Sequence, residues 1–168
     1  MSLIFVDCEA FGGAPVVGKL TEFGAVEYKT QQSFHGILWT AIPDPDHPVT
    51  SRLDPLAVQK TEEERKQVFV EFDKWLKQFK PPYVFVSDNN GYDWQWINDG
   101  FWKYLNYNPF GHSSRRISDF YAGLVGNFYT PARTWKSLRI TYHDHNPVHD
   151  AMGNLEAFKR MLNGERGK

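Results

Sequence analysis

A short, uninterrupted apolar run near the N-terminus ends in two acids. Leu3 to Val6 is followed directly by Asp7 and, two positions later, by Glu9. A continuous apolar run of this length is typical of a buried strand, and side chains two positions apart on a strand share one face. Two carboxylates this close repel each other unless a cation lies between them, and hard oxygen ligands suit Mg²⁺ or Mn²⁺. The run therefore predicts a buried strand that carries the first two ligands of a metal site.

Length, charge and cysteine content narrow the class of protein. The 168 residues contain no linker-like stretch or charge block that would divide them, so we expect one domain covering residues 1–168. The formal net charge of −1 and the pI near 6.6 mean that any positive groove for a polyanion must be local. The single Cys8 excludes a disulfide framework and favours a cytoplasmic location. No apolar stretch approaches the roughly twenty residues of a membrane span, so we expect no membrane partner.

Turn residues divide the first part of the chain into three strands. We expect strands over Leu3–Asp7, Glu22–Tyr28 and Phe34–Ala41, separated by turns at 12–15 and 29–32. These three strands should form a meander. Prolines then predict a stiff irregular crossover, and the chain beyond them contains a proline suited to a first helical turn. The residues concerned are Pro43, Pro45 and Pro48 for the crossover and Asp54-Pro55 for the start of a short helix.

Helices and strands alternate over the remainder. Thr61 to Glu64 is a capping-box pattern, and apolar residues follow it at helical spacing until Pro81. A second buried apolar strand runs through a turn cluster to Asp93, which thus lies at a strand-to-helix junction. The remaining elements are expected as a strand over Tyr83–Ser87, a helix to about Leu105, a loop over Asn106–Ser114, and helices over Ile117–Leu124, Trp135–Ile140 and Asn146–Leu162. The pattern predicts an α/β fold with a mixed central sheet, the three-stranded meander plus parallel strands, flanked by helices.

Three short motifs carry the acids. They are Val6-Asp7-Cys8-Glu9, the segment from Asp88 to Asp93, and the segment from His145 to Asp150. Together they resemble the DEDDh 3'-5' exonucleases of the ribonuclease H-like superfamily. The stretches at 21–26, 108–114 and 135–139 are most similar to the compact single-domain exoribonuclease branch. The resemblance implies a ribonuclease H-like exonuclease fold over nearly the whole chain.

The resemblance also implies a role for each motif residue. The metal ligands would be Asp7, Glu9, Asp93 and Asp150, holding two divalent metal ions, Mg²⁺ or Mn²⁺. His145 would act as the general base. The substrate would be single-stranded nucleic acid with a free 3' end, cut to nucleoside 5'-monophosphates, and we favour RNA. The alternatives are a DNA-directed 3'-5' exonuclease of proofreading type and a non-catalytic oligonucleotide-binding or adaptor protein on the same fold.

Two departures from the family pattern concern the seating of the substrate. The second motif often has a histidine where Asp88 stands, and the first often has Thr-Thr-Gly where this chain has Ala10-Phe11-Gly12. We expect Phe11 in a loop at the metal end, where a terminal base could stack on it, and a loop aromatic tucked into the core is the alternative. The predicted substrate-binding residues are Phe11, Gly12, Asn90 and Arg139.

Basic residues gather between the second and third motifs. They are Arg115, Arg116, Arg133, Lys136 and Arg139. Clustered cations near an active site are suited to contacting phosphates, and a solvated helix surface has the same composition. The sequence predicts a phosphate-contacting edge here, with the solvated surface as the alternative.

The roles of the histidines and of the other acids depend on spacing. Three histidines stand close together near Asp150, and they could form a polar loop or a metal cluster of imidazoles. Spacing favours His145 over His143 and His149, because it precedes Asp150 by five residues as the family pattern requires. Asp93 could also stabilise a helix N-terminus. The acids interpreted as turn, cap or surface residues are Asp88, Asp99, Asp119 and Asp144.

Aromatic residues make up 16% of the chain and include six tryptophans. Most of them are expected in the core, because large aromatics dominate core burial. Four exceed what one small core needs, namely Trp39, Trp102, Tyr104 and Tyr107. Exposed aromatics at this density commonly mark an interface, so we predict a homodimer.

Overall fold

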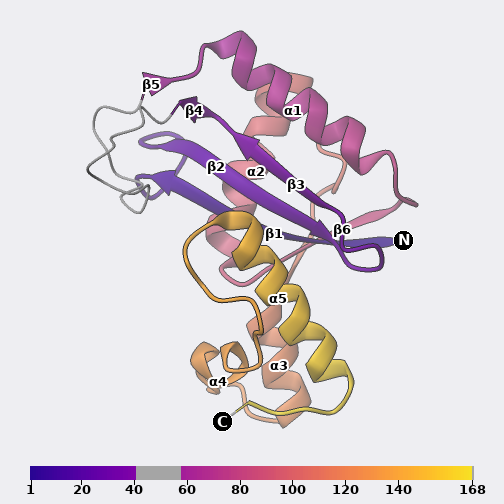
Figure 1. The fold of residues 1–168 in the computed structure, drawn as a ribbon. Helices are drawn as coiled ribbons and strands as arrows, with labels where there is room; N and C mark the ends of the chain where they lie inside the picture. Colours follow the sequence, from indigo (N-terminus) through magenta and orange to yellow (C-terminus); the bar gives the residue numbers. More distant parts are fainter. Residues whose placement is uncertain (41–57, 168) are drawn as a thin grey trace.

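The computed structural model describes residues 1–40 and 58–167, and helices cover both faces of a five-stranded mixed sheet (Figure 1). The strands are β1 (Ser2–Phe11), β2 (Lys19–Glu27), β3 (Ser33–Ile37), β4 (Trp39–Thr40), β5 (Val58–Gln59), β6 (Tyr83–Ser87) and β7 (Ser114–Arg116). The helices are α1 (Glu62–Leu76), α2 (Asn90–Leu105), α3 (Ile117–Val125), α4 (Ala132–Lys136) and α5 (Pro147–Leu162). The crossover expected at Pro43, Pro45 and Pro48 and the helix expected at Asp54-Pro55 lie outside the described residues.

The strand order β3-β2-β1-β6-β7 places β1 at the centre of the sheet. β1 pairs antiparallel with β2, and β2 pairs antiparallel with β3, which confirms the predicted meander. β6 pairs in parallel with both β1 and β7, which confirms the mixed sheet. Because the carboxyl ends of parallel strands lie at one edge of a sheet, the acids on β1 and after β6 are brought to the same edge.

Three predicted boundaries of the strands are wrong. β1 continues to Phe11 with a bulge after Glu9, so Phe11 ends a strand and does not lie in a loop. The third strand is divided, because β4 leaves the main sheet and pairs with β5, and Ala41 lies outside the described residues. β7 was not expected, and it lies between the end of the loop predicted to Ser114 and the helix predicted from Ile117. Its three polar residues are too few to show a strand period.

The helix expected over Trp135–Ile140 is shifted towards the N-terminus, because α4 ends at Lys136. The backbone after α4 bonds to α5 instead of continuing a helix. The N–H groups of Ile140 and Thr141 donate to Glu156 Oε2 at 3.0 and 2.7 Å. Backbone groups must find partners somewhere, and these partners come from a helix that the local sequence does not contain.

The helices that carry the motif acids begin as their sequences indicate. Asn146 caps α5 by accepting a hydrogen bond from the Val148 N–H at 3.0 Å, and Pro147 occupies the first turn. α2 begins at Asn90, so part of the expected turn cluster is helical and Asp93 lies in the first helical turn. The predicted capping box of α1 is also confirmed.

Apolar side chains fill both faces of the sheet. Ile4, Val6 and Cys8 pack with α1 and α2, whereas Phe5 packs with α3, α4 and α5. This alternation directs Asp7 and Glu9 towards the face that α5 covers. The acids of β1 therefore meet the first turn of α5 and not the aromatic core beneath α1.

The four aromatics predicted at an interface differ in exposure. Trp102 and Tyr107 are 45% and 38% exposed. Tyr104 packs partly into the core and donates a hydrogen bond to Glu62 at 2.9 Å, and Trp39 is half-buried.

Among the described residues, no helix combines the length and the apolar content that crossing a membrane requires.

Candidate active site

The carboxylates of β1 and α5 form one cluster. Asp7 and Glu9 project from one face of β1, and Asp150 lies in the first turn of α5. One carboxylate oxygen of each residue lies within 4.8 Å of those of the other two. The structure thus brings together three of the four predicted metal ligands.

Gly24 of β2 allows α5 to approach the sheet this closely. It is the strand partner of Asp7. A Cβ atom at position 24 would lie 2.2 to 2.3 Å from backbone atoms of Pro147 and Val148. A hydrogen atom fits in that space and a methyl group does not. Gly24 is therefore a positioning residue for Asp150, and the motif spacing did not single it out.

The cluster fits divalent cations. The Asp150 side chain is 1% exposed, and neither of its oxygens has a hydrogen-bond partner among the described residues. The Oδ2 atom of Asp93 is buried and unpartnered in the same way. Buried carboxylates without partners are costly, and several hard oxygen ligands in one place suit Mg²⁺ or Mn²⁺.

Asp93 connects the first turn of α2 to β1, next to the carboxylate cluster. Its Oδ1 atom accepts a hydrogen bond from the backbone N–H of Cys8 at 3.1 Å. Burial raises the pKa of Asp93 to about 7, and the hydrogen bond from the Cys8 N–H opposes that rise. Burial and the nearby acids also raise the pKa of the Cys8 thiol, so this thiol is protonated at neutral pH and is not a nucleophile.

Asp7 experiences the negative charge of the other acids. Burial raises its pKa well above the usual range, and repulsion by Asp93, Asp150 and Glu9 raises it further. The guanidinium of Arg139 opposes the rise. Bound dications would remove the repulsion, because a metal ion is the largest local charge in such a site.

The metal-free protein is expected to become more stable as the pH falls from 8 to about 5. The folded-state pKa of Asp93 is about 7, against about 3.9 in an unfolded chain. A raised pKa contributes stability that is fully present below the unfolded value and is lost as the pH rises through the folded value. Between pH 8 and pH 5 this corresponds to roughly 2 to 3 kcal/mol of unfolding free energy, since about two pH units lie below the folded-state pKa. Thermal unfolding in a chelator measures the effect, and Asp93→Asn should flatten it. A stability that falls steadily between pH 8 and pH 5 would contradict the assignment.

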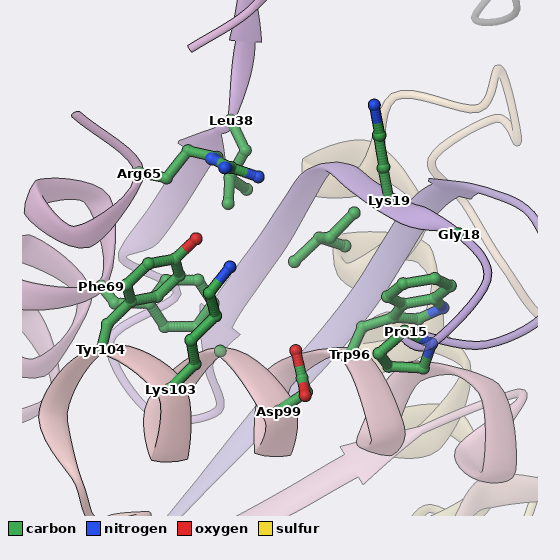
Figure 2. A pocket seen from close by; sticks show the side chains of 12 residues that line it. Pro15, Gly18, Lys19, Leu38, Arg65, Phe69, Trp96, Asp99, Lys103 and Tyr104 are labelled. Atoms are coloured by element: carbon green, nitrogen blue, oxygen red, sulfur yellow. The ribbon is translucent and has the colours of Figure 1, made fainter. Parts of the chain in front are cut away.

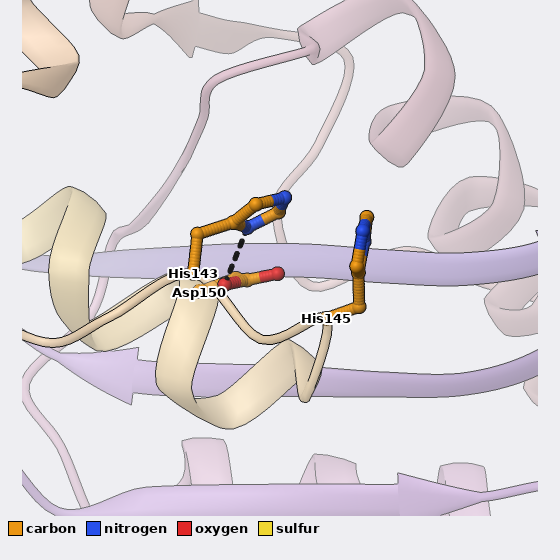
Figure 3. Close-up of side chains that lie close together, drawn as sticks. All are labelled: His143, His145 and Asp150. Atoms are coloured by element: carbon orange, nitrogen blue, oxygen red, sulfur yellow. Dashed lines mark ion pairs between the residues drawn. The ribbon is translucent and has the colours of Figure 1, made fainter. Parts of the chain in front are cut away.

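Two histidines from the loop before α5 flank the Asp150 carboxylate (Figure 3). His143 Nδ1 lies 2.7 Å from Asp150 Oδ1, and His145 Nδ1 lies 3.9 Å from Glu9 Oε1. Their ring centroids are 4.3 Å apart. The structure therefore places His143, as well as the predicted His145, against the acids.

The backbone of His145 is in the left-handed region, with φ of 67°. Such a conformation costs a non-glycine residue on the order of 1 to 3 kcal/mol and persists where the surroundings dictate it. Here the next residue is held on both sides: the Asn146 N–H donates to Asp144 Oδ1 at 2.9 Å, and the Asn146 side chain caps α5. The strained turn brings the His145 imidazole towards the acids.

The predicted substrate-binding residues of the first two motifs lie at the same edge of the sheet. Phe11 is 60% exposed and is not tucked into the core. Gly12 follows it with φ of 88°, a conformation that favours glycine. The Asn90 side-chain amide donates to Ser114 Oγ at 2.7 Å and so joins the start of α2 to β7.

Two cations of the predicted basic edge are paired with Asp88. Lys136 Nζ lies 2.5 Å and Arg139 Nη2 lies 3.6 Å from Asp88 Oδ2. The Arg139 side chain is 9% exposed, hydrogen bonds to Asn154 and lies over the Trp135 ring. Asp88 lies in the bend after β6 and is the centre of an ion-pair group, so of the predicted turn, cap and surface roles the exposed surface acid is excluded. The exposed members of the basic edge are Arg115, Arg116 and Arg133.

A separate cavity opens beside the β1–β2 hairpin, between α1 and α2 (Figure 2). Its volume is about 80 Å³, and it is partly open to solvent. Arg65 and Trp96 line it, and the Nε atom of Arg65 and the indole N–H of Trp96 have no hydrogen-bond partner in the described part of the chain. The cavity lies on the opposite face of the sheet from Asp7 and Glu9, so it is distinct from the carboxylate cluster.

Comparison with known proteins gives one similar curated sequence and several similar structures. No protein-family model matches the chain. The 3'-5' DNA exonuclease Cap18 of Escherichia coli is 27% identical over 169 residues, which cover 93% of this chain and 90% of that protein. The nuclease domain of 3'hExo, a DEDDh family member bound to rAMP, has a TM-score of 0.61 and 14% identity over 99% of this chain and 96% of that one.

A second solved structure extends beyond this chain. The zinc-bound complex of E. coli ExoI with ssDNA has a TM-score of 0.60 and 18% identity, over 96% of this chain. The match covers 39% of the ExoI chain, so this chain spans well under half of that protein.

The fold is the ribonuclease H-like fold of the DEDDh exonucleases, as the motifs predicted. In sequence the chain is similar to a 3'-5' DNA exonuclease, and in fold it is similar to a DEDDh exonuclease. Its assignment to the compact exoribonuclease branch stays a prediction.

Proposed function

We propose that this chain removes nucleotides one at a time from the 3' end of single-stranded nucleic acid and releases nucleoside 5'-monophosphates. The cluster of Asp7, Glu9 and Asp150 carries the proposal, because it joins three buried or half-buried carboxylates at the carboxyl edge of an exonuclease fold. Release of mononucleotides from a 5'-labelled single strand, dependent on Mg²⁺ or Mn²⁺, tests it. A strand left intact with both ions would oppose the proposal.

The four acids would hold two divalent cations, which lower the pKa of a water molecule and offset charge on the leaving oxygen. Asp7 interacts with each of the other three acids. It is therefore the acid best suited to serve both ions. Asp93 would support the second ion directly or through water, since one of its oxygens is unpartnered and the other is held by Cys8.

His145 would accept the proton of the attacking water, and His145→Ala should lower the turnover rate roughly a hundredfold while substrate binding is kept. Its ring lies beside Glu9, and its exposed side chain can reach a water molecule over the cluster. Single-turnover hydrolysis measures the rate. His149→Ala is the matched control, because that histidine pairs with Asp144 at 2.8 Å. A larger loss in His143→Ala than in His145→Ala would assign the proton transfer to His143 instead.

Phe11 would stack on the terminal base, and Phe11→Ala should weaken strand binding by about 1 to 3 kcal/mol whatever the base. The ring is exposed at the end of β1, two residues beyond Glu9. Fluorescence anisotropy in an Asp7→Asn background measures binding without hydrolysis. Phe128→Ala is the control, because Phe128 is an exposed aromatic elsewhere on the surface. A change of base preference, rather than a uniform loss, would contradict stacking.

The exposed arginines of the basic edge would contact upstream phosphates. We propose single-stranded DNA as the first substrate to test, although the motifs favoured RNA. The similar protein that covers 93% of this chain is named a DNA exonuclease, and discrimination rests on contacts to the 2'-hydroxyl. Digestion of RNA and DNA oligomers of one sequence, side by side with Mg²⁺ and Mn²⁺, decides between them.

We also propose that residues 1–168 act as one exonuclease domain, in the cytoplasm and as a homodimer. Trp102 and Tyr107 remain exposed on or next to α2 and are suited to a contact between two copies. Light scattering at micromolar concentration tests the dimer. A mass near the 19.5 kDa of one chain would oppose it.

A further inference from the structure

The two histidines that flank Asp150 offer nitrogen ligands beside a cluster that otherwise offers oxygen. One ring nitrogen of His143, one of His145 and one Asp150 oxygen lie within 4.8 Å of one another (Figure 3). His143 approaches Asp150 to 2.7 Å without hydrogen-bond geometry, since both oxygens of this buried carboxylate lack a hydrogen-bond partner among the described residues. A buried carboxylate that has no hydrogen bond, pairs with one imidazole and lies close to a second is suited to share a cation with both.

Nitrogen and oxygen ligands select different metals. Two imidazoles and one carboxylate suit Zn²⁺, whereas sites made of carboxylates suit Mg²⁺ and Mn²⁺. Zn²⁺ bonds to such ligands at about 2.0 to 2.2 Å and accepts three protein ligands with a fourth position open. The side chains of His143 and His145 are 49% and 63% exposed, so they can rotate to close the remaining distance.

We propose that Zn²⁺ binds to His143, His145 and Asp150 and thereby inhibits the enzyme. The site shares Asp150 with the carboxylate cluster, so an ion held there competes for one of the acids that hold Mg²⁺. It also occupies the imidazole of His145, which can then no longer accept a proton. The inhibition rests on the proposed nuclease function, whereas the binding of Zn²⁺ does not.

His143 is the residue that distinguishes this zinc site from the carboxylate cluster. It has no part in the proposed hydrolysis, and its contact with Asp150 adds the second nitrogen ligand. Removing one of three protein ligands should weaken binding at least as much as removing an outer-shell partner does, roughly tenfold or more.

Co²⁺ serves as a coloured substitute for Zn²⁺ in the test of binding. Bound to imidazole nitrogen at low coordination number, Co²⁺ absorbs visible light, and Mg²⁺ does not. The full-length, untagged, metal-free protein is titrated with Co²⁺ and then with Zn²⁺. We expect a visible band that Zn²⁺ displaces, in the unchanged protein and in the inactive Asp7→Asn variant. His143→Ala should lose the band or need at least tenfold more Co²⁺, and the control His149→Ala should match the unchanged protein.

Inhibition is tested on the same samples. The Zn²⁺ concentration that halves the Mg²⁺-dependent rate, normalised for each variant, should rise at least tenfold in His143→Ala. Equal Zn²⁺ affinity in His143→Ala and the unchanged protein would overturn the proposal, as would the lack of any visible band. A band lost in Asp7→Asn but kept in His143→Ala would also overturn it. A His143-dependent band in a protein without nuclease activity would defeat the proposed function and leave the zinc site standing.

Discussion

Asp7→Asn is expected to abolish hydrolysis while the protein stays folded. The side chain interacts with the other three acids, so its loss removes a ligand and one of the repelling charges at once. Metal ions contribute several kcal/mol to such a reaction, so the rate should fall roughly a thousandfold or more. The metal-free variant should melt at a higher temperature than the unchanged protein at pH 8, because the carboxylate it lacks has a strongly raised pKa.

Nuclease assays and thermal unfolding on the same samples measure both effects. Asp99→Asn is the matched control, because Asp99 is an exposed acid of α2 outside the cluster. Near-normal turnover of Asp7→Asn at saturating Mg²⁺ would contradict the metal assignment. A lower melting temperature in the chelator would contradict the repulsion between the acids.

Gly24→Ala is expected to lower both stability and activity. The new methyl group would meet the backbone of Pro147 and Val148, and that backbone cannot rotate away as a side chain can. Overpacking of this kind costs about 1 to 3 kcal/mol. The first turn of α5 would move from β2 and carry Asp150 with it, and a displacement of about 1 Å at a reacting centre lowers the rate by about a hundredfold.

Gly123→Ala separates this effect from glycine replacement in general. Gly123 is exposed on α3, and a Cβ there would have no atom within 4 Å. The variant should keep full activity and gain up to about 1 kcal/mol of stability, because alanine favours a helix over glycine. Denaturant unfolding and the rate of hydrolysis are the measurements. Full activity in Gly24→Ala would mean that the approach of α5 is not limited by this contact.

The parts of the fold that the sequence predicts are those with a local cause. The buried apolar runs, the Thr61 capping box and the Asn146-Pro147 helix start each reflect a preference of a few adjacent residues. The motif acids are predicted for the same reason, since each follows or begins such an element. Parallel pairing of β1 with β6 then brings them together.

The parts that the sequence does not predict depend on contacts between distant segments. The need for glycine at position 24 arises from the backbone of α5, more than a hundred residues later in the chain. Asp88 resembles an ordinary turn acid until α4 brings Lys136 to 2.5 Å from it. Spacing in the sequence favours His145. The left-handed backbone at His145 and the proximity of His143 to Asp150 are not predicted by any local sequence pattern.

The central claim is that the chain degrades single strands from a free 3' end. Two oligonucleotides of one sequence test it most directly, one capped by phosphorothioates at its 3' end and the other at its 5' end, each digested with Mg²⁺ and compared with a circular strand. Hydrolysis of the terminal bond needs a cleavable 3' phosphodiester at the carboxylates. We predict rapid release of mononucleotides from the 5'-capped strand and none from the 3'-capped or circular strands. Equal degradation of both capped strands, or cutting of the circle, would contradict the account.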